Sequence, residues 1–279
     1  MRLVTQQVRA LGEDGFVILR DRFKPDEIDA LNRRLPHLWD EAVEANIRED
    51  GSGDVRMALA LHKRDDLFAR LAIDPRLVAP AQQILREPFY IQQTKVNNKA
   101  VATDEGGYWH HAFANHRIKD GVTQPLALNI HVFLDDVTPF NGPMSFIPGS
   151  HISDTGHLQD HPVSMNVDLT AHTTNFPVTV NAFERSIQRA KRGHARQGVV
   201  AATGGRGTVV IFFNSTLHYA PRNGPAAKRT VFSMIVNPIS NPYQNTRRPD
   251  HWHHKTLKPV VAATDADLFS AYRKRALKT

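Results

Sequence analysis

The chain has 279 residues, a net charge of +7 and no cysteine. This length can bury the core of one large domain, so we expect a single domain spanning 1–279. Without cysteine, disulfides, zinc thiolate sites and iron–sulfur clusters are excluded. No apolar run reaches the roughly 18 residues of a membrane helix, and no apolar leader segment opens the sequence. We therefore expect a cytoplasmic protein without a membrane partner.

The positive charge has two interpretations: it keeps the surface soluble, or it attracts an anionic partner. Lys and Arg are dispersed along the sequence, without a long basic block or a nucleic-acid motif. A nucleic-acid polymer is therefore not expected as a partner. A small anionic substrate fits the charge balance better.

The first third of the chain has mainly helical patterns and gives a helical N-terminal part over about 1–88. Helices are expected at residues 3–13, 25–45 and 67–85, with one strand at 15–19. The second helix begins at Pro25 with acidic residues in its first turn, as helix starts commonly do. The third is expected to break near Asp74-Pro75.

From Phe89 onward the pattern changes to short strands separated by Gly, Pro and Asn turns. The candidates are 90–96, 126–134, 208–213 and 229–236. Helices followed by such strands predict a mainly β fold with a helical buttress, a double-stranded β-helix (jelly roll, cupin-like) with its core at about 89–237. Asn129 and His131 alternate with apolar neighbours and should share the opposite face of their strand. Residues 152–200 match no strong template beyond a helix near 182–192, and a lid is a possible role for them.

Two of the fifteen histidines stand out by their context. His110 follows Tyr108-Trp109, and His218 follows a predicted buried strand and a turn. Arg229 lies eleven residues after His218. Two distant histidines followed by an arginine form the skeleton of a non-haem iron oxygenase.

The segments around these residues resemble the phytanoyl-CoA dioxygenase superfamily, and within it the ectoine hydroxylases. The resemblance is carried by Gln93–Asn97, Tyr108–His110, Lys119–Gly121, Leu134–Pro143, Ile147–His151, His218 and Arg229. It implies Fe(II), 2-oxoglutarate and O2 as cofactors, with His110 and His218 as the iron ligands. It also implies Arg229 as the ion-pair partner of the distal 2-oxoglutarate carboxylate, to which a planar guanidinium can donate two hydrogen bonds. Asn97 and Asn129 match positions near the cosubstrate.

The chain departs from this family at one position. The family motif is His-x-Asp, whereas this sequence reads His110-His111-Ala112, and no histidine has Asp or Glu two residues later. Iron- and 2-oxoglutarate-dependent halogenases resemble hydroxylases with Ala or Gly at that position, where chloride takes the place of the carboxylate. The favoured interpretation is thus a halogenase with His110, Ala112 and His218 as its catalytic set and Ala112 beside the halide.

Two other interpretations stay open. A hydroxylase could use water or an unusual ligand such as His111, although in an extended segment His111 would point away from its neighbour His110. A non-catalytic relative could bind an anionic ligand without turnover. The retained His218 and Arg229 speak against the second of these.

The substrate pocket is expected to be more polar than in ectoine hydroxylases, because their aromatic residue six positions after the first histidine is His116 here. Candidate substrate-binding residues are Gln93, Lys95, His111, Asn115, His116, Arg247 and Arg248. Arg248 matches the arginine of an Arg-Pro-Glu block in ectoine hydroxylases; the block is either a solvated segment or a phosphate or carboxylate clamp. Related halogenases chlorinate the sugar of free deoxyadenosine monophosphate. A nucleotide is therefore favoured over an amino-acid derivative, and no carrier protein is expected.

Overall fold

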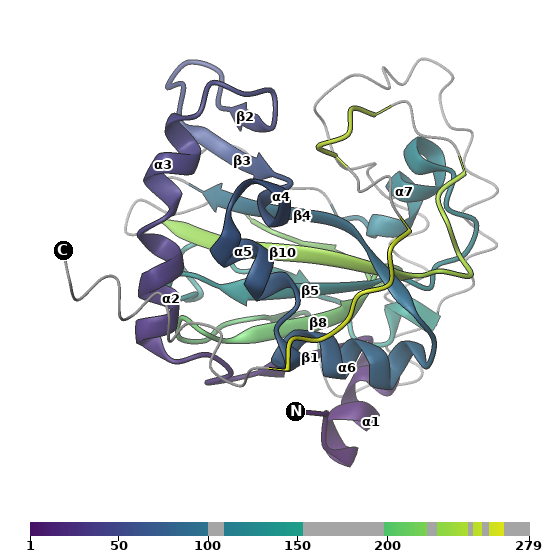
Figure 1. Cartoon of the computed structure of the whole chain (residues 1–279). Helices are drawn as coiled ribbons and strands as arrows, with labels where there is room; N and C mark the ends of the chain where they lie inside the picture. Colours follow the sequence, from purple (N-terminus) through teal and green to yellow (C-terminus); the bar gives the residue numbers. More distant parts are fainter. Residues whose placement is uncertain (100–108, 153–197, 222–227, 245–247, 253–256, 265–279) are drawn as a thin grey trace.

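The computed structural model describes residues 1–99, 109–152, 198–221, 228–244, 248–252 and 257–264 (Figure 1). Within them, a larger antiparallel sheet has the strand order β1-β8-β5-β10-β4-β3-β2 and a smaller one the order β7-β6-β9. The larger sheet consists of β1 (Phe16–Leu19), β2 (Asn46–Arg48), β3 (Val55–Leu59), β4 (Phe89–Lys99), β5 (Leu128–Phe133), β8 (Val209–Phe213) and β10 (Arg229–Pro238). The smaller consists of β6 (Ser145–Phe146), β7 (Val200–Ala201) and β9 (His218–Tyr219).

Aromatic side chains join the two sheets. The Phe146 ring of the smaller sheet lies 4.6 Å from the Phe16 ring and 5.0 Å from the Phe212 ring of the larger one. Val210 and Val231 belong to the same buried cluster. Two antiparallel sheets packed face to face around such a core form the expected jelly roll.

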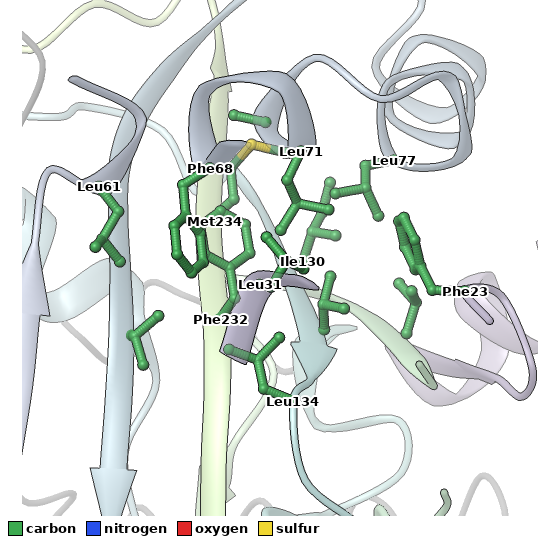
Figure 2. Packing of buried hydrophobic residues seen from close by; sticks show 14 of the residues in the cluster. Phe23, Leu31, Leu61, Phe68, Leu71, Leu77, Ile130, Leu134, Phe232 and Met234 are labelled. Carbon is green, nitrogen blue, oxygen red and sulfur yellow. The ribbon is translucent and has the colours of Figure 1, made fainter. Parts of the chain in front are cut away.

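Helices cover the outer face of the larger sheet (Figure 1). They are α1 (Thr5–Asp14), α2 (Pro25–Asn32), α3 (Leu35–Asp40), α4 (Leu61–Arg64), α5 (Asp66–Ala72) and α6 (Pro75–Leu85). Helix α7 (Ala112–Asp120) and a 3-10 turn at Ser150–Ile152 contribute no residue to the apolar cluster of this layer. Figure 2 shows Phe68 and Leu71 of α5 packed against Phe232 and Met234 of β10. This apolar layer is the helical buttress that the sequence predicts. No helix in the described ranges is long and apolar enough to cross a membrane.

The helix predicted at 25–45 is wrong in its length. Two short helices occupy this stretch, α2 ending at Asn32 and α3 beginning at Leu35. Pro36 lies in the first turn of α3. Its ring would clash with the carbonyl group of Asn32, four residues earlier, and it has no N–H to donate. The first helix therefore ends at Asn32.

The first 88 residues also contribute more strands than predicted. β3 pairs with β4, and β2 pairs with β3, so this unpredicted hairpin extends the larger sheet. β1 was expected and pairs with β8. The helical N-terminal part and the jelly-roll core are thus interleaved in the fold rather than divided near residue 88.

The pleat of the larger sheet sorts side chains between the helix layer and the interior. Phe232, Met234 and Val236 of β10 belong to the helix-side cluster, so Ser233 between them faces the interior. Across the ladders, Ser233 pairs with Lys95 on one side and with His131 on the other. The strand register therefore confirms that Asn129 and His131 share one face of β5, opposite to Leu128, Ile130 and Val132, and shows that this face is the interior one.

Several predictions fall outside the described residues. The predicted helix at 182–192 lies entirely outside them, and so does the predicted lid at 152–200 apart from its ends. Arg247 is also outside them.

Candidate metal centre and substrate pocket

His110 and His218 meet across an isolated antiparallel bridge. The N–H of His110 donates to the carbonyl of His218 at 3.0 Å, and the N–H of His218 donates to the carbonyl of His110 at 2.9 Å. Both side chains are buried, and their ring centroids lie 4.3 Å apart. Two imidazoles this close can reach the same metal ion.

The hydrogen bond of the His218 ring defines its tautomer. Its Nδ1 lies 2.8 Å from the carbonyl oxygen of Thr216 and must donate to it. Nε2 then carries a lone pair, which is the arrangement found in metal-binding histidines. Burial lowers the pKa of His218 well below its usual range, and the nearby His110 ring lowers it further. A neutral ring is the form that binds a metal.

Among the residues that the structure describes, no third protein ligand accompanies the two histidines. Ala112 is the first residue of α7, and its side chain ends at a methyl group. Across the described ranges, no group of three or more His, Cys, Asp or Glu side chains could hold a metal ion. In this part of the fold, the carboxylate missing from the sequence motif is therefore not replaced from another strand.

His111 has a different task in the structure. Its backbone is extended, and its Nδ1 accepts the N–H of Ala114 at 3.3 Å, which caps the start of α7. An imidazole at this position satisfies one of the helix's first amide groups. This contact gives His111 a structural role and weakens the hypothesis that it replaces the missing ligand.

Arg229 is buried at the start of β10 with 5% of its surface exposed. Its Nε has no hydrogen-bond partner, and no carboxylate in the described ranges forms an ion pair with this side chain. Burial lowers the pKa of the guanidinium to about 10. A buried, unpaired cation is costly, so an anionic ligand fits this position.

Asn129 on β5 offers a second buried donor. Its Nδ2 is enclosed and has no partner among the described residues. Asn97 on β4 is half-buried and lies opposite Val231 of β10. Together with Arg229, these positions fit a dicarboxylic cosubstrate, as the sequence implied.

The interior wall next to this site is positively charged. Burial lowers the pKa of Lys95 to about 8, and the charges of Arg248 and Arg56 add to the effect. Burial also lowers the pKa of His131 to about 3, with contributions from Lys95 and Arg229. Removal of water and mutual repulsion make this wall a favourable place for an anion.

A β-bulge in β4 places two glutamines on this wall. Gln93 lies opposite Ile235 and Ile91 opposite Val236, so Gln92 is the extra residue. Gln93 donates to the carbonyl of Trp252 at 2.6 Å, and the Gln92 side chain contacts His116. Gln93, a candidate substrate-binding residue, is therefore engaged in a contact within the protein. The bulge also brings Gln92 to the candidate site, and Gln92 was not among the candidates named from the sequence.

The second half of α7 carries the other candidate substrate residues. Asn115 and His116 lie on this helix. Arg248 donates through Nη2 to Oδ1 of Asn115 at 2.9 Å and lies 3.4 Å from Asp120 through Nε. Arg248 is buried, so the interpretation of this residue as part of a solvated segment is wrong.

Four residues of this region were missed as site candidates, namely Arg56, Gln92, Asp120 and His131. Asp120 belongs to the segment Lys119–Gly121, which contributes to the family resemblance, but no role of its own was assigned to it from the sequence. His131 was predicted on the same strand face as Asn129, also without a role. The strand register and the bulge, which bring these side chains together, cannot be read from local sequence.

A jelly roll with two converging buried histidines and an unpaired interior arginine defines a class of metal-dependent oxygenases. The chain belongs to the phytanoyl-CoA dioxygenase family, whose model matches residues 11–231. It is 32% identical over 267 residues to an L-proline trans-4-hydroxylase from Streptomyces griseoviridis, covering 92% of this chain and 94% of the relative. It is also 32% identical over 244 residues to an ectoine dioxygenase from Sphingopyxis alaskensis, covering 85% and 76%.

Solved structures agree with the fold. EctD from S. alaskensis with bound Fe has a TM-score of 0.77 and 26% identity, covering 94% of this chain and 87% of that one. EctD with 2-oxoglutarate and 5-hydroxyectoine has a TM-score of 0.75 at 26% identity, covering 93% and 86%. The carbocyclase SnoK, at 18% identity, covers 94% of both chains with a TM-score of 0.68 and supports the fold alone. The predicted jelly roll is confirmed.

Proposed function

We propose that this protein is an iron- and 2-oxoglutarate-dependent enzyme that chlorinates an unactivated C–H bond of a free, small, anionic molecule. His110 and His218 would hold the iron, and Arg229 the distal carboxylate of 2-oxoglutarate. Iron, 2-oxoglutarate and O2 together supply the oxidising power for such a bond. Family membership and the EctD structures with iron and 2-oxoglutarate support this assignment.

Ala112 is the observation that carries the halogenase assignment. Two histidines and a chelating 2-oxoglutarate leave room on an octahedral iron for chloride beside O2 when no carboxylate binds. The methyl group of Ala112 cannot coordinate a metal, and no substitute ligand group is found in the described residues. The protein would therefore supply two imidazole ligands to the iron and leave the position of the family carboxylate open for chloride.

Hydroxylation is the second candidate, because the relatives at 32% identity are named as a proline hydroxylase and an ectoine dioxygenase. Water would then occupy the free position. A non-catalytic, ligand-binding relative is a third possibility. Consumption of O2 in the presence of iron and 2-oxoglutarate separates the two enzymes from the binding protein.

The positively charged wall around Lys95 favours an anionic substrate. A nucleotide such as deoxyadenosine monophosphate is our first candidate. A free amino acid or its derivative is the second, supported by the names of the relatives. Neither substrate requires a carrier protein.

The decisive experiment uses anaerobic protein with Fe(II), 2-oxoglutarate, chloride and a panel of nucleotides and amino acids. Oxygen is then added, and the products are analysed by mass spectrometry. We expect a product that has gained chlorine and whose formation depends on chloride. Products that gain oxygen but never chlorine across the panel would assign the protein as a hydroxylase.

Substitution at position 112 tests the vacant position directly. Ala112→Asp should abolish chlorination, because the new carboxylate competes with chloride for the metal. Ala112→Gly is the matched control and should retain chlorination, since it leaves the position without a ligand. Product mass spectra and iron content are measured for both variants. Unchanged chlorination in Ala112→Asp would show that the halide does not bind there.

A further inference from the structure

His116 and Asp120 form a buried pair on α7, outside the metal-binding histidines. Their side chains are one turn apart on the helix, and Nδ1 of His116 lies 2.6 Å from Oδ2 of Asp120. Only 3% of His116 and none of Asp120 is exposed. A contact this short between a buried imidazole and a carboxylate is a strong hydrogen bond.

The neighbours of the pair define where its proton lies. The oxygen of the Gln92 amide accepts from Nδ2 of Asn237 at 3.1 Å, so its nitrogen faces the pair. This nitrogen lies 2.8 Å from Nδ1 of His116 and 3.4 Å from Oδ2 of Asp120. The proton assignment follows from the 2.6 Å contact with Asp120, because an ionised carboxylate only accepts hydrogen bonds. Nδ1 of His116 therefore carries the proton and donates it to Asp120.

The other nitrogen of the His116 ring is available to a ligand. Nε2 has no hydrogen-bond partner among the described residues. Unlike Nδ2 of Asn129, this atom is not completely enclosed by its neighbours. Burial lowers the pKa of His116, the hydrogen bond to Asp120 opposes this, and the charges of Arg248 and Lys95 add to the lowering. With Nδ1 protonated and the ring neutral, Nε2 is a hydrogen-bond acceptor.

We propose that the Asp120-anchored ring of His116 is a specificity-determining group that accepts a hydrogen bond from the substrate through Nε2. The cations Lys95 and Arg248 lie close enough to His116 to lower its pKa. The structure therefore assigns a substrate class: a small anion that also carries an N–H or O–H donor. This inference rests on the proposed function only in placing the substrate in this pocket.

The role of Asp120 is that of a positioning residue. Its carboxylate accepts the hydrogen bond from Nδ1 of His116 and also lies 3.4 Å from Nε of Arg248. Asp120 therefore connects the His116 ring to the Arg248 guanidinium. Removing its charge by Asp120→Asn should allow His116 to place its proton on Nε2 instead. The ring would then present a donor where the substrate also presents one.

The test is a binding measurement on the full protein with two matched pairs of probes. One pair is deoxyadenosine monophosphate and its N6,N6-dimethyl derivative. The other is L-proline and tetrahydrofuran-2-carboxylate, in which an ether oxygen replaces the ring NH2+ group and so removes its donors together with its charge. In at least one pair, the member with the donor should bind about tenfold more tightly, the equivalent of one hydrogen bond. Calorimetry gives the affinities without turnover, so the result is independent of whether chlorination occurs.

His116→Phe should remove this preference within the pair, and Asp120→Asn should reduce it. His62→Phe is the matched control: His62 is also hydrogen-bonded to β4, through Thr94, but lies in the helix layer. It should keep the preference even if it lowers stability. The pKa of His116 is lowered from 6.5 by burial, so in the wild type the affinity for the donor-bearing probe should fall only as the pH is taken below 6.5 and the ring becomes protonated. This fall should be absent in His116→Phe.

Three results would overturn the inference. They are equal binding of both members in each pair, an unchanged preference in His116→Phe, and no binding of either donor-bearing probe. A failure of chlorination with the preference intact would instead count against the proposed function alone.

Discussion

At the scale of single residues, Arg229 differs from the largely buried arginines Arg76 and Arg248. Arg76 and Arg248 both face carboxylates, whereas Arg229 has no acidic partner in the described part of the chain. An enclosed charge of this kind is normally paired or bound to a ligand. Arg229 is therefore the residue whose substitution should report on cosubstrate binding most directly.

Arg229→Ala should raise the 2-oxoglutarate concentration needed for half-maximal O2 consumption by roughly 10- to 100-fold. That range is the effect of losing hydrogen bonds between charged groups. Arg48→Ala, which removes an exposed arginine bonded to the carbonyls of Gly53 and Trp39, is the control and should leave the requirement unchanged. An equal requirement in Arg229→Ala and the wild type would refute the cosubstrate assignment.

At the scale of elements, one arginine joins the starts of two helices on the outer face. Arg76 of α6 bonds to Asp74, which caps the same helix, and to Glu27 in the first turn of α2. Its guanidinium also lies 3.9 Å from the ring centre of Phe23. Since all three charged side chains are largely buried, this cluster fixes the distance between α2 and α6 behind the sheet.

Arg76→Ala should lower the free energy of unfolding by about 3–5 kcal/mol, because it leaves two buried carboxylates without their cation. Urea unfolding followed by circular dichroism measures this loss. Arg9→Ala is the control: its pair with Glu13 is exposed, so the free energy of unfolding should change little. Similar losses in the two variants would show that the buried cluster does not hold the helices together.

At the scale of the whole molecule, the interior contains histidines that must stay neutral for the protein to fold. Burial lowers the pKa of His131 from 6.5 to about 3. The unfolded chain therefore binds a proton at this residue at a pH where the folded chain does not. The stability from neutral His131 is complete above pH 6.5 and is lost as the pH falls towards 3.

His131→Phe should make stability less dependent on pH in this window. As the pH falls, the free energy of unfolding of the wild type should decrease by up to about 1.4 kcal/mol per pH unit more than that of the variant. This is the effect of one proton bound on unfolding. Urea unfolding of both proteins between pH 7.5 and 5, with iron removed by a chelator, gives the two slopes. Identical slopes would mean that His131 takes up a proton without unfolding.

The strand pattern and the core of the site could be predicted because their signals are local. Alternation of apolar residues located β5, β8 and β10, and the contexts of His110 and His218 selected them from the other histidines. The break at Pro36 was missed although its cause is local. The hairpin of β2 and β3 was missed because its strands are short and belong to the edge of the sheet.

The sequence alone determined which chemical groups this protein has: a methyl group at Ala112 in place of a carboxylate, two histidines in a family pattern, and an arginine after the second. Only the tertiary structure decided how these groups meet. It brings His110 against His218, leaves Arg229 without an acidic partner among the described residues, and places Nδ1 of His116 against the carboxylate of Asp120. Residue identity is local, whereas pairing, burial and tautomer depend on strand register and on contacts between distant segments.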